Sequence, residues 1–317
     1  MAPIGRKPPY PRAPFELSAL TLAAAPTDPA VDNAAAVALL RRAWKEGITT
    51  FDTVDVPNPA VAEMLLARAF PHPEPSLVVL SGVPGSASRD SASPPHLDRG
   101  SNALGTALPP ARGAWPVHRL FELDAASADP TSGRASDRSY GSLPAGAEVV
   151  VRCRSWEEVL AVRGQPRPML VAVELSMLNR TFATPVAPDG GRRDVAWVVR
   201  DPFAGGRLDG SRFDRRLSAP LSGPPPSVRD LEAEFGPIAR FRFLARPGRR
   251  TLAQAALRFV LDLPGVATVC IPMPRVERWN EIVGYERSAP LDDGERARIE
   301  VLARTPAPEE EGSGGFR

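Results

Sequence analysis

The amino-acid sequence predicts an α/β protein built as a (β/α)8 TIM barrel. Short apolar runs, typical of buried strands, alternate with segments of helical periodicity along most of the 317 residues. About eight such runs in a chain of this length favour a closed parallel barrel over an open doubly wound sheet. No GxGxxG motif follows the first strand, which argues against a Rossmann fold.

The N-terminal half begins with a basic, proline-rich tail, residues 1–14, that we expect to be disordered. Residues 15–25 have the apolar character of a signal peptide, but an acidic residue interrupts them, so a strand is the preferred interpretation. Asp32 or Asn33 can cap the first helix, and Gly47 ends it. The elements expected here are strands at 17–22, 48–52, 77–80 and 119–123, helices at 34–45 and 59–70, a loop at 84–95 and a short helix near 102–108.

The C-terminal half continues the alternation with two long breaks, residues 125–147 and 207–226, which carry no apolar pattern. Whether the first break folds over the barrel mouth as a lid is left open. The elements expected here are strands at 148–153, 169–174, 195–200 and 267–271, and helices at 155–162, 227–235, 251–263, 276–283 and 291–303. We therefore expect one domain over 15–304, with loop insertions at about 84–100, 125–147 and 207–226, and a disordered tail at 305–317.

Charge and cysteine content exclude several classes of function. The chain carries 39 Lys or Arg against 37 Asp or Glu, so it lacks the basic surplus of a nucleic-acid binder. No uninterrupted apolar stretch reaches about 18 residues, which excludes a membrane span. Cys153 and Cys270 cannot build a disulfide framework, and we expect buried, inert thiols in a reducing bacterial cytoplasm. His72, His96 and His118 lack the spacing of metal ligands, so no metal site is expected.

Several segments resemble the aldo/keto reductase family. The stretch GITTFDTVDVPNPAVAEMLLARAF within 38–70 is similar to the family segment in which a strand ends in Asp-Thr and a helix with a Glu-Leu-Leu core follows. VAVELSMLNR (171–180) is similar to the sixth-strand signature, and VVRDPFAGGRLDG (198–210) to the seventh strand with its glycine-rich loop. The end, TLAQAALRFVLDLPGVATVCIP (251–272), matches best. The resemblance implies a barrel of the aldo/keto reductase type, and residues 84–147 align poorly.

The resemblance also implies a reaction and a set of four catalytic residues. In the family a hydride passes from NADPH to a carbonyl while a Tyr, tuned by a Lys, an Asp and a His, donates the proton. Asp52 stands at the position of the Asp. The Tyr position holds Pro57, the Lys position falls at Ser81 and Gly82, and the His position falls at or near Asp124.

The chain offers few substitutes for the missing groups. Its lysines are Lys7, in the N-terminal tail, and Lys45, on a helix that precedes the strand of Asp52. A replacement proton donor would have to be Tyr140 or Tyr285, and neither matches a family position. We expect Asp52 and Asp124 to be the remaining catalytic candidates, with Asp52 alternatively a structural carboxylate that binds nearby backbone.

The implied nicotinamide contacts are changed as well. Arg152 and Cys153 stand where the family places a Ser-Asn pair, Ala172 replaces the sixth-strand Gln, and Arg200 replaces the Tyr that stacks on the ring. Standard carbonyl reduction is therefore not expected.

The implied phosphate contacts are partly kept. Arg275 and Arg278 remain in the region that holds the adenine-side phosphate, so NADP binding stays open. The Gly205-Gly206 turn matches the loop that helps enclose the cofactor, although a plain tight turn would have the same sequence.

Arginines gather at the expected barrel mouth. Guanidinium groups that converge there would suit the carboxylate or phosphate of a small anionic ligand. The alternative is that acidic residues of the same rim pair with them in internal salt bridges. The arginines are Arg152, Arg154, Arg200 and Arg275, and the acids are Asp124, Glu174 and Asp201.

Three functions remain open from the sequence. The first is a divergent family member with a degenerate catalytic tetrad that uses the barrel mouth for another small molecule. The second is a non-catalytic regulatory barrel that still binds a nucleotide. The third is an NAD(P)H-dependent oxidoreductase with a rebuilt proton donor. The sequence does not distinguish the oligomeric state.

Overall fold

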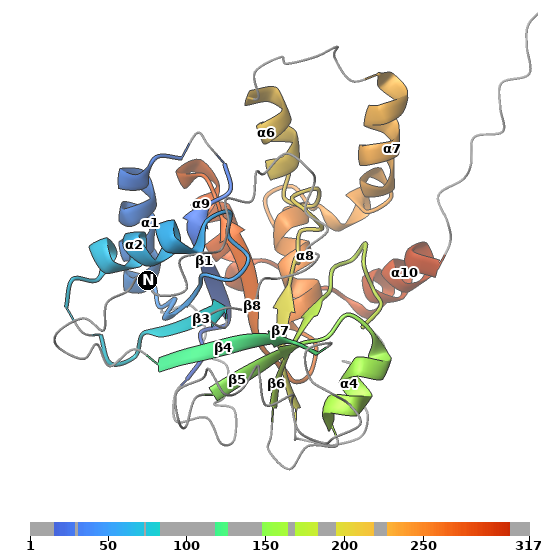
Figure 1. The fold of residues 1–317 in the computed structure, drawn as a ribbon. Helices are drawn as coiled ribbons and strands as arrows, with labels where there is room; N and C mark the ends of the chain where they lie inside the picture. Colours follow the sequence, from blue (N-terminus) through green and yellow to red (C-terminus); the bar gives the residue numbers. More distant parts are fainter. Residues whose placement is uncertain are drawn as a thin grey trace, which may run out of the picture.

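The computed structural model describes residues 16–28, 31–72, 74–82, 118–125, 148–163, 169–182, 195–218 and 227–304. Within them eight parallel strands form a closed barrel (Figure 1), in which each strand pairs with its neighbours in sequence and the last pairs with the first. The strands are β1 (Leu20–Pro26), β2 (Thr50–Asp52), β3 (Val78–Gly82), β4 (His118–Asp124), β5 (Glu148–Arg152), β6 (Met169–Glu174), β7 (Val195–Arg200) and β8 (Val266–Met273). The TIM-barrel prediction is confirmed.

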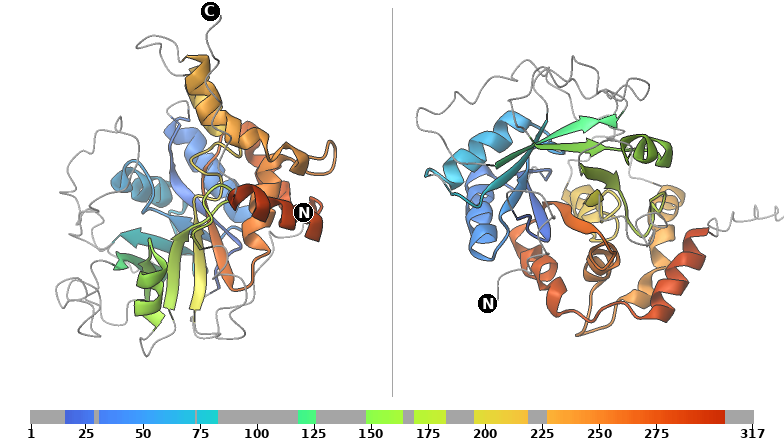
Figure 2. Two further views of the ribbon diagram at one scale, coloured as in Figure 1. Left: turned by 90° about the vertical axis from the view of Figure 1, so that its right-hand side faces the viewer. Right: turned by 90° about the horizontal axis from the view of Figure 1, so that it is seen from below.

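Helices lie around the outside of the strands, as the right-hand view of Figure 2 shows. They are α1 (Asn33–Lys45), α2 (Pro59–Ala69), α4 (Trp156–Arg163), α6 (Ser211–Ser218), α7 (Val228–Ala239), α8 (Leu252–Leu261), α9 (Val276–Val283) and α10 (Asp293–Arg304), with short 3-10 turns η2 (Arg242–Leu244) and η3 (Gly284–Arg287). Helices α6 and α7 stand away from the barrel beyond the ends of the strands in both figures. No helix in the described ranges is long and apolar enough to cross a membrane.

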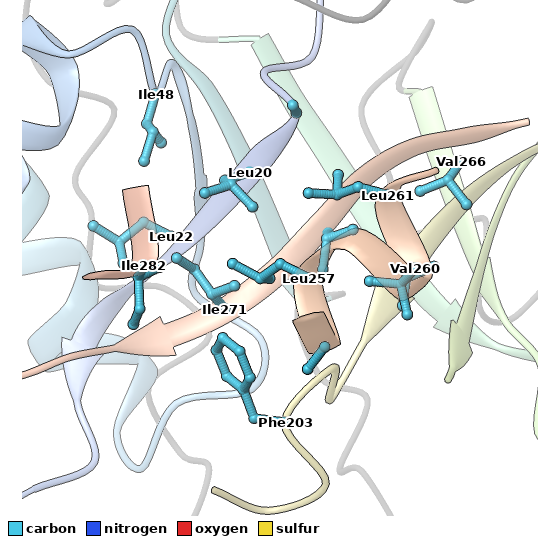
Figure 3. Packing of buried hydrophobic residues seen from close by; sticks show 14 of the residues in the cluster. Leu20, Leu22, Ile48, Phe203, Leu257, Val260, Leu261, Val266, Ile271 and Ile282 are labelled. Carbon is cyan, nitrogen blue, oxygen red and sulfur yellow. The ribbon is translucent and has the colours of Figure 1, made fainter. Parts of the chain in front are cut away.

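Two apolar layers hold the barrel together. The outer layer lies between strands and helices, where Leu22 and Ile271 of neighbouring strands pack near Leu257 and Ile282 (Figure 3). The inner layer fills the barrel and contains Leu17, which precedes β1, together with alternate residues of the strands: Val78, Leu80, Leu120, Val150, Leu170, Ala172, Ala196, Val198 and Cys270. Full burial of a Leu or Ile side chain stabilises the fold by about 1.5–3 kcal/mol, so these layers supply the main driving force.

Polar residues fix the starts of several helices. Asp32 accepts a hydrogen bond from the backbone N–H of Ala35 at 2.7 Å, which confirms it as the cap of α1. Thr251 and Gln254 form a reciprocal capping box at α8, so this helix starts at Leu252. Helix α9 has the bounds expected from the sequence.

The first strand begins later than expected, at Leu20 rather than at residue 17. Ser18 breaks the ladder, because its hydroxyl accepts hydrogen bonds from the backbone N–H groups of Thr49 and Thr50 at 3.2 and 3.1 Å. Leu17 therefore closes the lower end of the barrel interior instead of pairing in the sheet.

Two expectations for the segment after β7 are wrong. Part of the tract 207–226 is helical, because Asp209 accepts hydrogen bonds from the N–H and hydroxyl of Ser211 at the start of α6. Helix α7 continues past Phe235 through a Gly-Pro pair, with Pro237 inside the helix. The rings of Phe213 and Phe235 meet edge to face at a centroid distance of 5.8 Å and join the two helices. The expected helix at 102–108, the loop at 84–100 and the break at 125–147 lie outside the described residues.

Candidate functional site

The carboxyl ends of the strands bring charged side chains together at one end of the barrel, called the mouth here. Parallel pairing sets Gly82 beside Glu122 and Asp124 beside Arg152. Because side chains alternate along a strand, residues two positions beyond the apolar inner layer also face inward. The result is a set of five paired side chains, called the mouth network: Asp52, Asp55, Glu122, Arg152 and Arg200.

Arg200, at the end of β7, is the centre of the mouth network. Its side chain is 2% exposed and donates to Asp52 from Nη1 at 2.8 Å and from Nη2 at 3.2 Å. Nε donates to Glu122 at 3.0 Å, Nη2 donates to the same carboxylate, and Nη1 donates to Asp55 at 2.8 Å. All five N–H groups of this guanidinium are therefore used, as a buried cation requires.

Arg152, at the end of β5, forms the outer part of the mouth network. Its Nε donates to Glu122 at 2.5 Å, and its Nη2 contacts both carboxylate oxygens of Asp55 at 2.7 Å. Its Nη1 has no hydrogen-bond partner among the described residues, and the side chain is 14% exposed. Within the described ranges Arg152 thus keeps one donor group unused.

Burial and charge act in opposite directions on the acids of the mouth network. Burial raises the pKa of Glu122 above its usual range, against the opposing effect of Arg200 and Arg152. Desolvation also acts to raise the pKa of Asp55, but the same two arginines outweigh it and hold that pKa below its usual value. Desolvation works against the charge of Arg200, yet Asp52, Asp55 and Glu122 keep its pKa well above the usual value. The network therefore stabilises the charges of Asp55 and Arg200, whereas for Glu122 the cost of burial exceeds the attraction of its two arginine partners.

Asp52 makes the backbone contacts expected of a structural carboxylate, and it also has a partner that the sequence did not indicate. It pairs with Arg200, and its oxygens also accept hydrogen bonds from the backbone N–H of Val54 at 3.1 Å and of Asp55 at 3.4 Å. With an exposure of 2% it is buried beneath the loop that follows β2.

The other positions implied by the resemblance contribute no side chain to the mouth network within the described ranges. Pro57 is exposed in the loop after β2, and the Ser81 hydroxyl accepts a hydrogen bond from Arg119 at 3.0 Å. A Cβ added at Gly82 would have no atom within 4 Å among the described residues. Asp124 lies at the rim and pairs with Arg154 at 3.3 Å. The residue of β4 that enters the network is Glu122, which the sequence reasoning missed.

The rim acids also differ from expectation. Of the pairs considered from the sequence, Arg154 with Asp124 forms, whereas the partners of Arg152 and Arg200 are the mouth-network carboxylates. Asp201 accepts a hydrogen bond from the Gly205 N–H at 2.6 Å and has a positive φ of 52°. Although its side chain reaches solvent, desolvation by the surrounding loop raises the pKa of Asp201 to about 6.

A small pocket lies beside the mouth, after β8, and contains both expected phosphate-binding arginines. Arg275 pairs with Asp28 at 2.5 Å, and Arg278 pairs with Asp214 of α6 at 2.7 Å. The pocket is lined by Thr27, Asp28, Asp209, Ser211, Asp214, Pro272, Met273, Pro274, Arg275 and Arg278. Gly210 has φ +77° and lets Arg278 approach, since an added Cβ would lie 3.2 Å from its Nη2.

Gly205 and Gly206 lie in the loop between β7 and α6, with φ angles of 69° and 84°. The turn needs glycine at these positions because other residues rarely adopt such angles. The turn brings the N–H of Gly205 to Asp201 and the carbonyl of Gly206 to the N–H of Arg212. It is therefore a structural turn in this state.

Of the two substitute proton donors, Tyr285 is not at the mouth. Tyr285 lies in η3, where the guanidinium of Arg258 on α8 covers its ring at 5.7 Å, and burial raises its pKa. Tyr140 lies outside the described residues. Within the described ranges no group of three or more His, Cys, Asp or Glu is placed to hold a metal ion.

Comparison with known proteins identifies a family match for part of the chain and solved structures with a similar fold. Residues 149–304 match the model of the aldo/keto reductase family. Solved structures with the same fold include an aldo-keto reductase from Bacillus halodurans in a holo form (TM-score 0.62) and a glycerol dehydrogenase from Gluconobacter oxydans (TM-score 0.59). Each is 17% identical, with 97% of this chain and 99% of the other covered. The thermostable aldo-keto reductase Tm1743, solved with the inhibitor epalrestat, has a TM-score of 0.60 at 17% identity, with 94% of this chain and 99% of that chain covered. No curated protein sequence matches the chain.

Proposed function

Residues 149–304 belong to the aldo/keto reductase family, and from this premise we propose that the protein is a divergent barrel that does not carry out standard carbonyl reduction. Its mouth binds another small molecule, and the arginines of the mouth network recognise an anionic group of that ligand. The proposal concerns the site rather than the fold, because one barrel architecture supports many activities.

The pairing of Arg200 with Asp52 is the observation that carries this proposal. The resemblance implies that Asp52 tunes a proton donor through a lysine, and that a tyrosine of β7 stacks on the nicotinamide. Arg200 stands in place of that tyrosine and donates to both oxygens of Asp52 at 2.8 and 3.2 Å. Asp52 is thus neutralised by a guanidinium group, and Gly82 supplies no side chain at the lysine position. Loss of a general acid alone lowers a rate by about 10²- to 10⁴-fold.

The residues at the mouth do not fit a nicotinamide ring. A ring stacked against β7 would have to lie over the buried guanidinium group of Arg200, whose N–H groups are already bound to carboxylates. Nothing in the mouth network resembles the amide contacts that the resemblance implies. The described residues of the mouth therefore do not support a reaction of NADP at this site.

The pocket after β8 favours a second candidate, a regulatory barrel that binds a nucleotide without turnover. Arg275 and Arg278 line it at the start of α9, and guanidinium groups at a helix N-terminus suit a phosphate. Asp28 and Asp214 already pair with these arginines, so a phosphate would have to displace a carboxylate. The fit to a nucleotide phosphate is therefore partial.

Two measurements separate these candidates. Purified protein is titrated with NADPH and NADP while thermal unfolding is followed, because a ligand of the native state raises the midpoint. NADPH oxidation is then followed with a panel of aldehydes and ketones. The proposal predicts no carbonyl-dependent oxidation. Stabilisation by nucleotide without turnover would favour the regulatory barrel, and steady turnover would refute both.

A further inference from the structure

The three carboxylates of the mouth network differ in how they are held. Asp52 ends β2 and Glu122 lies within β4, and their side chains are 2% and 3% exposed. Asp55 belongs to the loop between β2 and α2, and its side chain is 43% exposed. Asp52 and Glu122 are thus fixed by strands, whereas Asp55 reaches the arginines from the solvent side.

Asp55 binds the arginines as a separate carboxylate ligand would. Its two oxygens lie 2.7 Å from Nη2 of Arg152, and one of them also accepts from Nη1 of Arg200 at 2.8 Å. Its own backbone N–H makes a long contact of 3.4 Å to Asp52. Charge-assisted hydrogen bonds of this kind are the usual way in which guanidinium groups recognise carboxylates.

Unsatisfied donors explain why the position between the two arginines suits an anion. Without Asp55, the carboxylates of Asp52 and Glu122 balance the guanidinium groups of Arg152 and Arg200, and the outer donors are unsatisfied. A monoanion at this position would satisfy them at the same charge as Asp55 does. Nη1 of Arg152, which has no hydrogen-bond partner in the described part of the chain, provides a further donor for a second oxygen of such a guest.

We propose that Asp55 is an internal stand-in for the carboxylate of a small-molecule ligand, which displaces it from between Arg152 and Arg200 when it binds. The inference deepens the proposed function, on which it rests, by naming small carboxylic acids as the ligand class. Displacement requires only that the Asp55 side chain rotate toward solvent, while Asp52, Glu122 and Arg200 stay in place. Asp55 thus lowers the apparent affinity of the site by competing for it.

The test compares binding of acetate and glycolate to wild-type protein and to Asp55→Ala by calorimetry and thermal unfolding. Removal of the competing carboxylate should tighten binding at least tenfold, and Arg152→Gln in the Asp55→Ala background should abolish the gain. Asp124→Ala is the matched control, because it removes a carboxylate of the same rim that pairs with Arg154 and leaves the mouth network intact. Asp55→Asn, which keeps the side-chain size, serves if Asp55→Ala does not fold.

The results that would overturn this inference differ from the result that would refute the proposed function. Equal affinity of wild type and Asp55→Ala, or no binding of either acid, overturns the inference even if carbonyl reduction is absent. Stabilisation by the diamine putrescine and not by the acids would overturn it in favour of a cationic ligand. Carbonyl-dependent oxidation of NADPH would instead refute the proposed function.

Discussion

Replacement of Arg200 by methionine is the sharpest test of the mouth network. The side chain is 2% exposed and is paired with Asp52, Asp55 and Glu122. The network carries three carboxylates and two guanidinium groups, so Arg200→Met changes its formal charge from −1 to −2. Asp52 and Glu122 then stay buried with fewer partners, which is the costly half of breaking an ion pair.

The size of the effect follows from that burial. Removing one partner of a buried ion pair destabilises a protein by about 3–5 kcal/mol. In a chain of this size 1 kcal/mol corresponds to roughly 2 °C in the unfolding midpoint, so the midpoint should fall by about 6–10 °C. The triple variant Arg200→Met, Asp52→Asn, Glu122→Gln leaves one carboxylate beside Arg152, and we expect it to recover most of the loss.

Thermal and urea unfolding of the wild type, the single variant and the triple variant measure these differences. Arg154→Met is the control, because its pair with Asp124 is at the same rim but exposed, and such pairs contribute about 0–1 kcal/mol. A loss below about 1 kcal/mol in Arg200→Met, or a triple variant no more stable than the single one, would show that the buried carboxylates do not depend on Arg200.

Three further predictions follow from the same structure. The pKa of Asp201 is raised to about 6, so the folded state binds its proton more tightly than the unfolded chain does. This contribution to the free energy of unfolding is present below pH 4 and is lost as pH rises through 6. Unfolding measured as a function of pH should therefore show wild type losing stability relative to Asp201→Asn over that range. Burial raises the pKa of Cys153 to about 12 and also raises that of Cys270, so a thiol reagent should modify neither in the native protein and both after unfolding. Arg250→Met should cost about 3–5 kcal/mol in urea unfolding, because Glu295 loses its buried partner and keeps the partly exposed Arg246, and three backbone carbonyls lose their donor. A loss similar to that of Arg154→Met would refute this.

Much of the barrel could be predicted from the sequence because its elements have clear periodicity. Strands β6 and β7 and helix α9 have the expected bounds. The errors occur where a side chain competes with the backbone pattern, as Ser18 does at β1, or where tertiary contact stabilises a weak helix, as Phe235 does for α6. Neither effect is visible in local apolar spacing.

The candidate site could be predicted in part. The sequence indicated that Arg152 and Arg200 would meet at the mouth, since both end parallel strands. It did not indicate Glu122, although alternation along β4 places that residue on the same face as Asp124 and one layer further inside. Asp55 was missed because its role depends on the path of the loop after β2, which no periodicity describes.

The two halves of the chain contribute opposite charges to the mouth network. Its carboxylates come from before residue 149 and its arginines from the region that matches the family model. Its contacts span 30 to 148 positions in sequence. A C-terminal half alone would hold two facing cations, and an N-terminal half alone three facing anions, so like halves repel and unlike halves attract. Two co-expressed fragments divided between β4 and β5 are therefore expected to assemble with each other rather than with their own copies.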